Sequence, residues 1–509
     1  MTPRWTSRLV VACLFAISFF LRWPSCGDSF WLDELHTAWC TFGTFGEVSG
    51  RASLGNQQPL YFGALWLWQR VPPTTLIDFY GIEAWMRLTS VVASAASASV
   101  AYLIVRRATK SPVGGIAAGL AMALESSSIF YGTELRPYAW VILLSTIAVG
   151  FASLPISRAS RWGLHLISLL AAATHLTSLI GLAPMIALVM VVDWFTAQCK
   201  PHPAAKWNQC HLGPIVVWCL FAFASVFNHV DLWGVRDRWN AFASPSTLWE
   251  IEGLWPWISL VLCPGIAAML TWLYRSRMKR SSITIAPVVR RWMIIICSVV
   301  LVSTFGCYLL SAWGGVPLWS RRYLVSGLPM ICVLFGCMVG WISQGQRTNQ
   351  FTAMIVMCFC LGDMGWQSGV LPKLYRGNPK LVVRDEGWRT ATRWINQHKE
   401  TLSIASVWVD PALIEQDEPS VIVANAIREH YFRFVADGPY RLDDAIEVIG
   451  TGRNATDEWL KLCQSGDAGL KTVLLTRRRI SRELLGSTNL NVKSFGRVKV
   501  LRWHAADTE

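Results

Sequence analysis

Residues 9–39 read LVVACLFAISFFLRWPSCGDSFWLDELHTAW, an apolar run followed by a short loop that ends in two adjacent acids. The run approaches the roughly 20 residues that cross a bilayer as a helix. Two arginines precede it, and no small-residue cleavage site follows it, so we predict a retained first helix with a cytoplasmic N-terminus. The acids, Asp33 and Glu34, stand among aromatic and aliphatic residues. Charges are costly at that depth, so the pair is a candidate functional site.

The composition of the 509-residue chain is that of a membrane protein. Hydrophobic residues make up 53% and charged residues 15%, whereas a soluble protein has about 25% charged residues. The 28 tryptophans suit two water–lipid interfaces. The net charge of +14 does not indicate nucleic-acid binding, because the basic residues lie in loops that alternate to one side. The lysines before residue 372 are Lys110, Lys200, Lys206 and Lys279.

The apolar segments and basic loops predict a polytopic α-helical membrane domain over residues 1–371. An odd number of crossings, about eleven, places the N-terminus inside and the C-terminus outside. The first outer loop, 24–85, holds the acidic pair and an apolar segment, 59–70, too short to span, which we interpret as an interfacial or re-entrant helix. The expected crossings lie near 9–23, 86–105, 113–131, 138–154, 162–175, 176–192, 212–229, 254–274, 292–312, 323–342 and 351–371.

Residues 372–509 have the composition of a soluble domain, and we predict a small extracytoplasmic α/β domain there. Asp385–His398 has the spacing of an amphipathic helix. Ser403–Asp410 and Lys471–Thr476 have the pattern of short buried strands, and Val492–Trp503 alternates as strands do.

Most of the 14 cysteines stand in apolar segments, where a thiol acts as a small hydrophobe. Cys26 and Cys40 flank the acidic pair and could form a disulfide. His36 and His175 suit hydrogen-bonded structural roles better than metal binding, since no spacing resembles a zinc site.

Further polar motifs fall on the same predicted side as the acidic pair. They are Asn56-Gln57-Gln58-Pro59-Leu60-Tyr61, Glu83-Ala84-Trp85-Met86-Arg87-Leu88, Tyr131-Gly132-Thr133-Glu134-Leu135-Arg136-Pro137-Tyr138 and Ser320-Arg321-Arg322-Tyr323-Leu324. We expect them to converge on one cavity in the outer leaflet. A carboxylate can take a proton from a hydroxyl, and arginines can hold a phosphate through two hydrogen bonds.

The order of these motifs resembles the GT-C superfamily of polyprenyl-phosphate-sugar-dependent glycosyltransferases. The broad group is that of the protein mannosyltransferases and the aminoarabinose transferase of lipid A. The resemblance covers roughly residues 8–345 and is carried by Trp31-Leu32-Asp33-Glu34, Pro59-Leu60-Tyr61-Phe62, Glu134-Leu135-Arg136-Pro137-Tyr138 and Arg322-Tyr323-Leu324. The chain departs from many relatives at Gln57-Gln58, where they carry a basic residue or histidine, and at Pro137.

The resemblance implies a multi-pass glycosyltransferase of a bacterial inner (plasma) membrane. It would move a hexose or pentose from a polyprenyl-phosphate carrier to a lipid, glycan or protein acceptor at the outer face. Asp33 is the expected general base, and Glu34 would orient the acceptor or bind a divalent metal ion, the one cofactor left open. The expected substrate- and phosphate-binding residues are Gln58, Tyr61, Glu134, Arg136, Arg321, Arg322 and Tyr323.

Other interpretations of the same residues stay open. The acidic pair could cap a helix, Arg321 and Arg322 could anchor a helix at the interface, and Glu134 and Arg136 could form a structural pair. Glu83 and Arg87 have the spacing of a helical ion pair. A transporter or flippase of a lipid-linked sugar would need polar groups near the midplane and repeated broken helices, and no internal repeat is visible. An inactive relative serving in membrane assembly is a third possibility.

Overall fold

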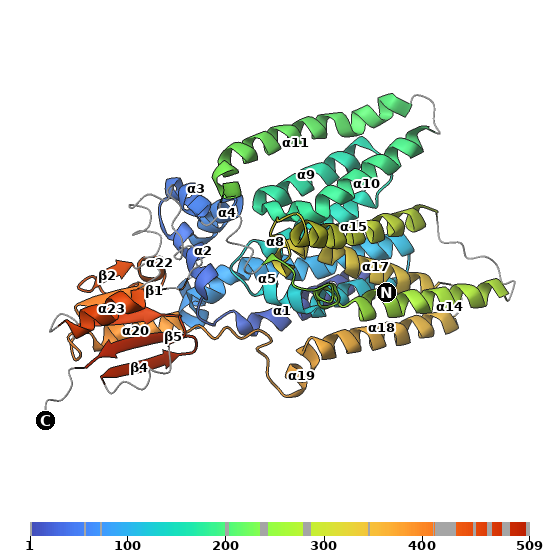
Figure 1. Ribbon diagram of the computed structural model, residues 1–509. Helices are drawn as coiled ribbons and strands as arrows, with labels where there is room; N and C mark the ends of the chain where they lie inside the picture. Colours follow the sequence, from blue (N-terminus) through green and yellow to red (C-terminus); the bar gives the residue numbers. More distant parts are fainter. Residues whose placement is uncertain are drawn as a thin grey trace. The chain divides into compact units, whose positions relative to one another are not determined.

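The computed structural model is mostly helical, with 73% of its described residues in helices and a small sheet near the C-terminus. It describes residues 3–54, 57–71, 74–198, 203–234, 243–277, 287–344, 347–410, 412, 434–450, 455–465, 471–480 and 489–504. Its contacts divide the chain into two compact units, which are labelled element by element in Figure 1. We call Met1–Cys26 with Arg87–Val382 the helical unit, and Gly27–Met86 with Val383–Glu509 the mixed unit. The predicted domain border at residue 371 stays a prediction.

The helical unit is built around α17, Leu328–Ile342, whose residues are all buried, as expected of a helix that is apolar on every side. Its closest neighbour is α6, Pro112–Leu124. A Cβ atom on Gly114 of α6 would lie 2.5 Å from the Cα of Gly340. Glycine at this crossing therefore lets the two backbones touch, as small residues do between membrane helices.

The other elements of the helical unit follow in chain order. They are α1 (Pro3–Arg22), η1 (Trp23–Ser25), the later part of α5 (Thr74–Thr109), α7 (Ser126–Gly132), α8 (Tyr138–Ala152), α9 (Arg158–Thr174), η2 (Leu176–Ser178), α10 (Leu179–Gln198), α11 (Pro203–Gly234), α13 (Glu250–Leu254), η4 (Ile258–Leu262), α14 (Cys263–Arg277), α15 (Pro287–Ala312), α16 (Arg321–Leu324), η5 (Val325–Gly327), α18 (Arg347–Gln367) and α19 (Val370–Tyr375).

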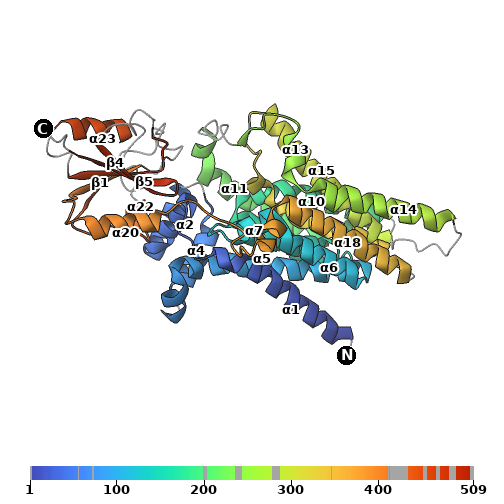
Figure 2. The ribbon, with the colours of Figure 1, turned by 90° about the horizontal axis from the view of Figure 1, so that it is seen from below.

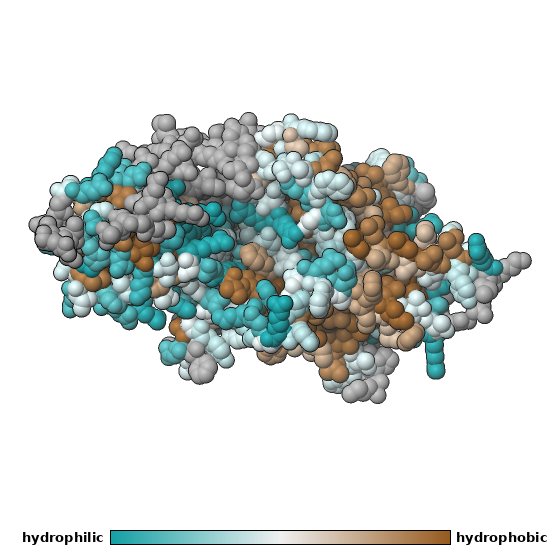
Figure 3. Space-filling model, turned by 60° about the horizontal axis from the view of Figure 1, so that its bottom comes forward, coloured by the Kyte–Doolittle hydropathy of each residue, from teal (hydrophilic) through white to brown (hydrophobic). Residues whose placement is uncertain are grey.

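Six helices among the described residues are long and apolar enough to cross a membrane, or seven if one bent pair counts as a single span. Hydrophobic residues gather on the surface of this unit (Figure 3). Exposed apolar side chains include Ile266 and Leu270 on α14 and Phe351 and Phe359 on α18. The chain is therefore a multi-pass membrane protein. The predicted count of eleven crossings and the predicted orientation stay predictions.

The crossing expected near 113–131 consists of two helices, α6 and α7, rather than one. α6 and α7 meet at Glu125 with a bend of 58°. The Glu125 carboxylate accepts a hydrogen bond from the backbone N–H of Ser128 at 2.7 Å, which makes it the N-cap of α7. Arg22, at the end of α1, donates to the carbonyls of Met122 and Ala123, which the break leaves without helical partners.

The mixed unit combines three short helices of the first predicted outer loop with a five-stranded sheet. The helices are α2 (Leu32–Phe42), α3 (Phe45–Leu54) and α4 (Pro59–Gln69), followed by the start of α5, which kinks at Gly81 with a φ of 85°. The C-terminal elements are α20 (Trp388–His398), β1 (Ser406–Asp410), α22 (Phe434–Asp437), β2 (Glu447–Gly450), α23 (Ala455–Gln464), β3 (Thr472–Thr476), β4 (Leu490–Phe495) and β5 (Val498–Trp503).

The sheet has the order β2-β1-β3-β5-β4. β1 is parallel to β2 and β3, whereas β5 is antiparallel to β3 and β4. α20 and α23 cover opposite faces of the sheet (Figure 2). The buried residues of α20 include Trp388 and Ile395, and Trp459 of α23 packs on Leu474 and Leu501.

The predicted elements of this unit are confirmed with shifted ends. The amphipathic helix begins at Trp388 rather than at residue 385. The first strand begins at Ser406, because Ser403 adopts a positive φ of 52° that a strand cannot contain. The alternating tail is a pair of strands that turns at Gly496, with a φ of 66°. The segment at 59–70 is helical, as predicted. The disulfide that could have joined Cys26 and Cys40 is not formed: the Cys26 thiol donates to the carbonyl of Arg22, and the Cys40 thiol contacts His36.

Candidate active site

The acidic pair forms the first turn of α2, and its two carboxylates have different surroundings. Trp31 is the N-cap, so Asp33 and Glu34 occupy positions where acids complement the helix dipole. The Glu34 carboxylate is fully buried and accepts a hydrogen bond from the Trp31 N–H at 3.2 Å. The Nε of Arg384 lies 3.9 Å from the same carboxylate oxygen. Glu34 therefore caps the helix, as the structural interpretation of the pair predicted.

Asp33 is only partly buried, although it is the immediate neighbour of Glu34. Successive helical residues point about 100° apart, so the two side chains leave the helix in different directions. The hydroxyl of Thr37 donates to the backbone carbonyl of Asp33, not to its carboxylate. Asp33 is therefore the more exposed of the two acids.

Three other predicted residues of the first loop lie in the mixed unit. Gln58 is the N-cap residue of α4 and is buried. Tyr61 is buried one turn later, with its ring 5.4 Å from that of Phe62 in an edge-on arrangement. α4 packs against α2, the helix that carries Asp33. His36 contacts the Cys40 thiol and the Phe434 ring, in keeping with the structural role predicted for it.

The second group of predicted residues lies in the helical unit, where the chain passes from α7 to α8. Pro137 is the N-cap of α8, and its carbonyl accepts the first helical hydrogen bond, from Val141 at 3.0 Å. The preceding loop buries Glu134 and Arg136, which are 1% and 6% exposed. The guanidinium of Arg136 lies 6.0 Å from the centre of the Tyr138 ring.

Aromatic rings surround this loop and extend the site beyond the predicted residues. The Tyr138 ring lies 5.0 Å from the ring of Tyr131 and 5.2 Å from that of His175. Burial, followed by the positive charges of Arg136 and Arg322, lowers the pKa of His175 to about 3. His175 is therefore neutral at physiological pH, and the positive charge of the cluster belongs to its arginines.

The two adjacent arginines of α16 make different contacts. Arg322 stacks near the Tyr323 ring at 5.2 Å and interacts electrostatically with Tyr131 and His175. Tyr323 in turn lies within electrostatic range of Arg136 and Tyr138. Arg321 is exposed and donates a hydrogen bond to the carbonyl of Gly253 at the end of α13.

Four predicted residues thus gather in the helical unit: Glu134, Arg136, Arg322 and Tyr323. Sequence reasoning did not select Tyr131, Tyr138 or His175 as site residues. The repeated tyrosine on either side of the Glu134–Arg136 motif was the available signal. Asp33, Glu34, Gln58 and Tyr61 belong to the other unit, so the single cavity expected for all these residues stays a prediction.

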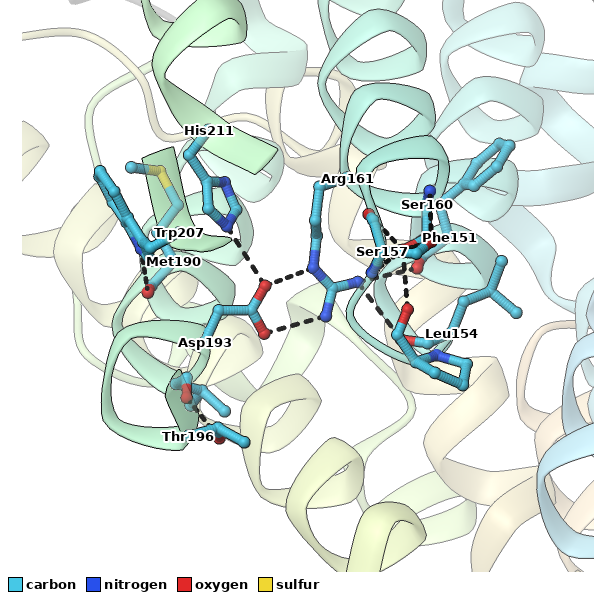
Figure 4. Close-up of polar contacts among 12 residues, drawn as sticks. Phe151, Leu154, Ser157, Ser160, Arg161, Met190, Asp193, Thr196, Trp207 and His211 are labelled. Atoms are coloured by element: carbon cyan, nitrogen blue, oxygen red, sulfur yellow. Dashed lines mark hydrogen bonds and ion pairs between the residues drawn. The ribbon is translucent and has the colours of Figure 1, made fainter. Parts of the chain in front are cut away.

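A separate polar cluster joins α9, α10 and α11 (Figure 4). The guanidinium of Arg161 donates through Nε and Nη2 to the two carboxylate oxygens of Asp193, and both side chains are 4% exposed. His211 Nε2 lies 3.2 Å from Asp193, and His165 Nε2 lies 3.1 Å from His211 Nδ1. The Trp218 indole donates to His165 Nδ1.

This second cluster has a single consistent direction of hydrogen bonding. An indole can only donate, so His165 Nδ1 accepts and its Nε2–H donates to His211 Nδ1. His211 then donates from Nε2 to Asp193. Every polar atom in the chain from Trp218 to Arg161 has a partner, so we assign the cluster to the stability of the three-helix packing.

A divalent metal ion is not needed to explain any of these contacts. Within the described part of the chain, no group of three His, Cys, Asp or Glu side chains is placed to hold one. The Glu34 carboxylate, the expected ligand, is occupied by the Trp31 amide and the nearby Arg384. Metal dependence stays a prediction.

The comparisons with known proteins identify the fold. No family model and no curated protein sequence matches the chain. Among solved structures, it is similar to ArnT from Cupriavidus metallidurans bound to undecaprenyl phosphate, with 13% identity and a TM-score of 0.53 over 100% of this chain and 99% of that one. It is similar to the apo state of the same ArnT, with 12% identity and a TM-score of 0.54 over 99% and 98%. The chain therefore has the fold of ArnT, a GT-C glycosyltransferase, as the resemblance of its motifs predicted.

Proposed function

We propose that this protein is a membrane glycosyltransferase that moves a monosaccharide from a polyprenyl-phosphate carrier to an acceptor hydroxyl at the outer face of a bacterial inner membrane. The observation that carries the proposal is the likeness in fold, over the whole chain, to an ArnT structure that holds undecaprenyl phosphate. About eleven crossings, with the N-terminus inside and the C-terminus outside, belong to the same proposal.

The arginine–tyrosine cluster of the helical unit suits the phosphate of the lipid carrier. It contains Arg136 and Arg322 as cations and Glu134 as an anion, while His175 is neutral, so its formal charge is positive. Buried or half-buried guanidinium groups bind phosphate oxygens through strong charge-assisted hydrogen bonds. The same groups stabilise the charge that grows on the phosphate as it leaves the sugar. Tyr323 adds a hydroxyl donor.

Asp33 suits the role of general base. In the proposed step the acceptor oxygen bonds to the anomeric carbon of the sugar, and the bond from that carbon to the carrier phosphate breaks. The acceptor proton passes to the Asp33 carboxylate, and the carrier leaves as the lipid monophosphate. Glu34 cannot easily share this role, because its carboxylate already accepts the Trp31 amide inside the fold.

One observation favours a different class, a flippase for the same lipid. The bent pair α6 and α7 breaks a predicted span at a buried acid, Glu125. Transporters commonly build their binding sites from such broken helices. The capping role of Glu125 explains the break without a transported ligand, so transfer remains the better supported function.

The two functions are separated by reconstituting the purified protein in liposomes with undecaprenyl phosphate linked to a labelled sugar. A panel of hexose and pentose donors is tested, with hydroxyl-bearing lipid, glycan and peptide acceptors. Transfer of the label to an acceptor, together with release of undecaprenyl phosphate, supports the transferase. Movement of the intact donor between leaflets without release of the phosphate supports the flippase and contradicts our proposal.

A further inference from the structure

Three consecutive backbone amides lead into the first turn of α2, and each donates to a side-chain oxygen. Phe30 donates to the hydroxyl of Tyr440 at 2.7 Å, and Trp31 donates to Glu34 at 3.2 Å. Leu32 donates to Glu386 Oε2 at 3.0 Å. Two of the three acceptors thus come from the C-terminal part of the mixed unit, more than 350 residues away along the chain.

Glu386 is itself held in place on both carboxylate oxygens. The Trp388 indole donates to Oε2 at 2.9 Å, the oxygen that also accepts from Leu32. Arg477 Nη1 donates to Oε1 at 2.7 Å. Glu386 is buried, so its carboxylate cannot move to solvent without losing these bonds. The Leu32 amide is therefore hydrogen-bonded to a carboxylate whose position is fixed by Trp388 and Arg477.

Tyr440 is held in a comparable way. Its hydroxyl donates to Glu83 Oε1 at 2.7 Å while it accepts from Phe30. Arg389 Nη1 donates to the same Glu83 oxygen, and the backbone N–H of Arg389 donates to the Ser29 hydroxyl. Burial, and then the charge of Glu83, raises the pKa of Tyr440, so the phenol keeps the proton that it donates.

We infer that Glu386 and Tyr440 are positioning residues for Asp33: the C-terminal α/β segment fixes the first turn of α2 and thereby the place of the catalytic carboxylate. The inference rests on the proposed function, in which Asp33 is the base. Asp33 directly follows the three tethered amides, so a shift of those amides moves its carboxylate. A misplacement of about 1 Å at a reacting group can reduce a rate about 100-fold.

The test uses four variants of the full-length protein. Tyr440→Phe removes the acceptor of the Phe30 amide, and Glu386→Ala removes the acceptor of the Leu32 amide. Glu386→Gln is the conservative variant, because its carbonyl oxygen can still accept from Leu32 and Trp388. Tyr375→Phe is the control, because Tyr375 is 90% exposed in the helical unit.

Two measurements are made on each variant, kcat and donor KM per folded molecule, and hydrogen–deuterium exchange of the peptide covering residues 27–36. We expect Tyr440→Phe and Glu386→Ala to lower kcat by about 10- to 100-fold with donor KM nearly unchanged. Their peptide should exchange about 5- to 100-fold faster, as expected when buried amides lose their acceptors. Tyr375→Phe should behave like the wild type in both measurements. Glu386→Gln should stay closer to the wild type than Glu386→Ala, because it keeps the acceptor of the Leu32 amide and loses only the bond that Arg477 donates.

Unchanged exchange in both Tyr440→Phe and Glu386→Ala would overturn the inference. So would faster exchange with a wild-type kcat per folded molecule, because the bonds would then support only the fold. If the wild type transfers no sugar, the proposed function and the inference that rests on it both fail. The exchange data then show separately whether the hydrogen bonds from the Phe30 and Leu32 amides hold the first turn of α2.

Discussion

Replacing one of two adjacent arginines should separate phosphate binding from helix anchoring. Arg322 belongs to the cluster with Tyr323, Arg136 and His175, whereas Arg321 is exposed and bonded to the carbonyl of Gly253. We predict that Arg322→Ala weakens binding of undecaprenyl phosphate strongly and that Arg321→Ala leaves it almost unchanged. The two variants remove the same side chain from neighbouring positions, so each serves as the control for the other.

The expected magnitude follows from the charges in the cluster. With Arg322 removed, Arg136 and Glu134 have a formal net charge of zero and His175 stays neutral, so the positive charge is lost. A hydrogen bond to a charged group contributes about 1.5–3 kcal/mol. A charge pair separated by about 5 Å contributes about 3 kcal/mol at an effective dielectric constant of about 20. These values correspond to a rise in Kd of about 10- to 150-fold for Arg322→Ala.

The assay is equilibrium binding of undecaprenyl phosphate to the purified variants in detergent, at two salt concentrations. Arg322→Ala should raise Kd by the predicted factor, and the wild-type affinity should fall as salt increases if phosphate contacts carry it. Arg321→Ala should stay within about threefold of the wild type, as expected of an exposed residue. Equal effects of the two substitutions, or no effect of Arg322→Ala, would refute the assignment of this cluster to the lipid phosphate.

Three further predictions concern stability, each measured by unfolding in detergent. Asp193→Asn should lower the free energy of unfolding by about 3–5 kcal/mol, because its buried arginine partner loses its anion; an unchanged unfolding midpoint would exclude the ion pair as a stabilising feature. His175, with a folded-state pKa of about 3, contributes stability at neutral pH that is lost as pH falls below its unfolded value of about 6.5. The wild type should lose about 2 kcal/mol more than His175→Asn between pH 7 and pH 5, and equal losses would contradict the burial of a neutral imidazole. Gly132→Ala should cost about 1–3 kcal/mol, because its Cβ would lie 2.5 Å from Arg22 Nε. Gly362→Ala, in open space, should cost less than about 1 kcal/mol, and the same cost at both glycines would argue against close packing at Gly132.

The sequence predicted many of the helices and strands because those depend on local patterns. Apolar runs located long apolar helices, and short buried runs and an alternating tail located strands of the C-terminal sheet. The Glu134–Arg136 motif and the Arg322–Tyr323 motif were grouped by their common sidedness, and the structure places both in one cluster. The alternative interpretation, in which the acidic pair caps a helix, is confirmed for Glu34.

The sequence could not predict features that depend on distant partners. Asp33 and Glu34 look alike in sequence, and only the contacts with Trp31 and Arg384 make Glu34 the cap. The hydrogen bond that the Leu32 amide donates to Glu386 joins residues 354 apart in the chain, so no local pattern marks it. The break at Glu125 was missed although Glu125-Ser126-Ser127-Ser128 interrupts the apolar run, and the Glu125 carboxylate that caps the Ser128 amide marks the start of a new helix.

The hydrogen bonds of Asp193 and His211 could not be predicted from the sequence either, because they also depend on distant partners. Eighteen residues separate them, and His165 lies on a third helix. Each residue alone resembles an isolated polar residue in an apolar segment. Only packing of α9, α10 and α11 shows that they form one chain of hydrogen bonds.

The most direct test of the account is the turnover of Asp33→Asn, measured with a donor that the wild type uses and compared with Glu34→Gln. The asparagine keeps the size of the side chain and removes its basic carboxylate. We predict that kcat falls by about 100- to 10,000-fold in Asp33→Asn, with the donor Kd and the unfolding midpoint unchanged. Glu34→Gln should instead lower the unfolding midpoint, because it weakens the cap of α2. Equal turnover of Asp33→Asn and the wild type would remove Asp33 from the mechanism and contradict the account.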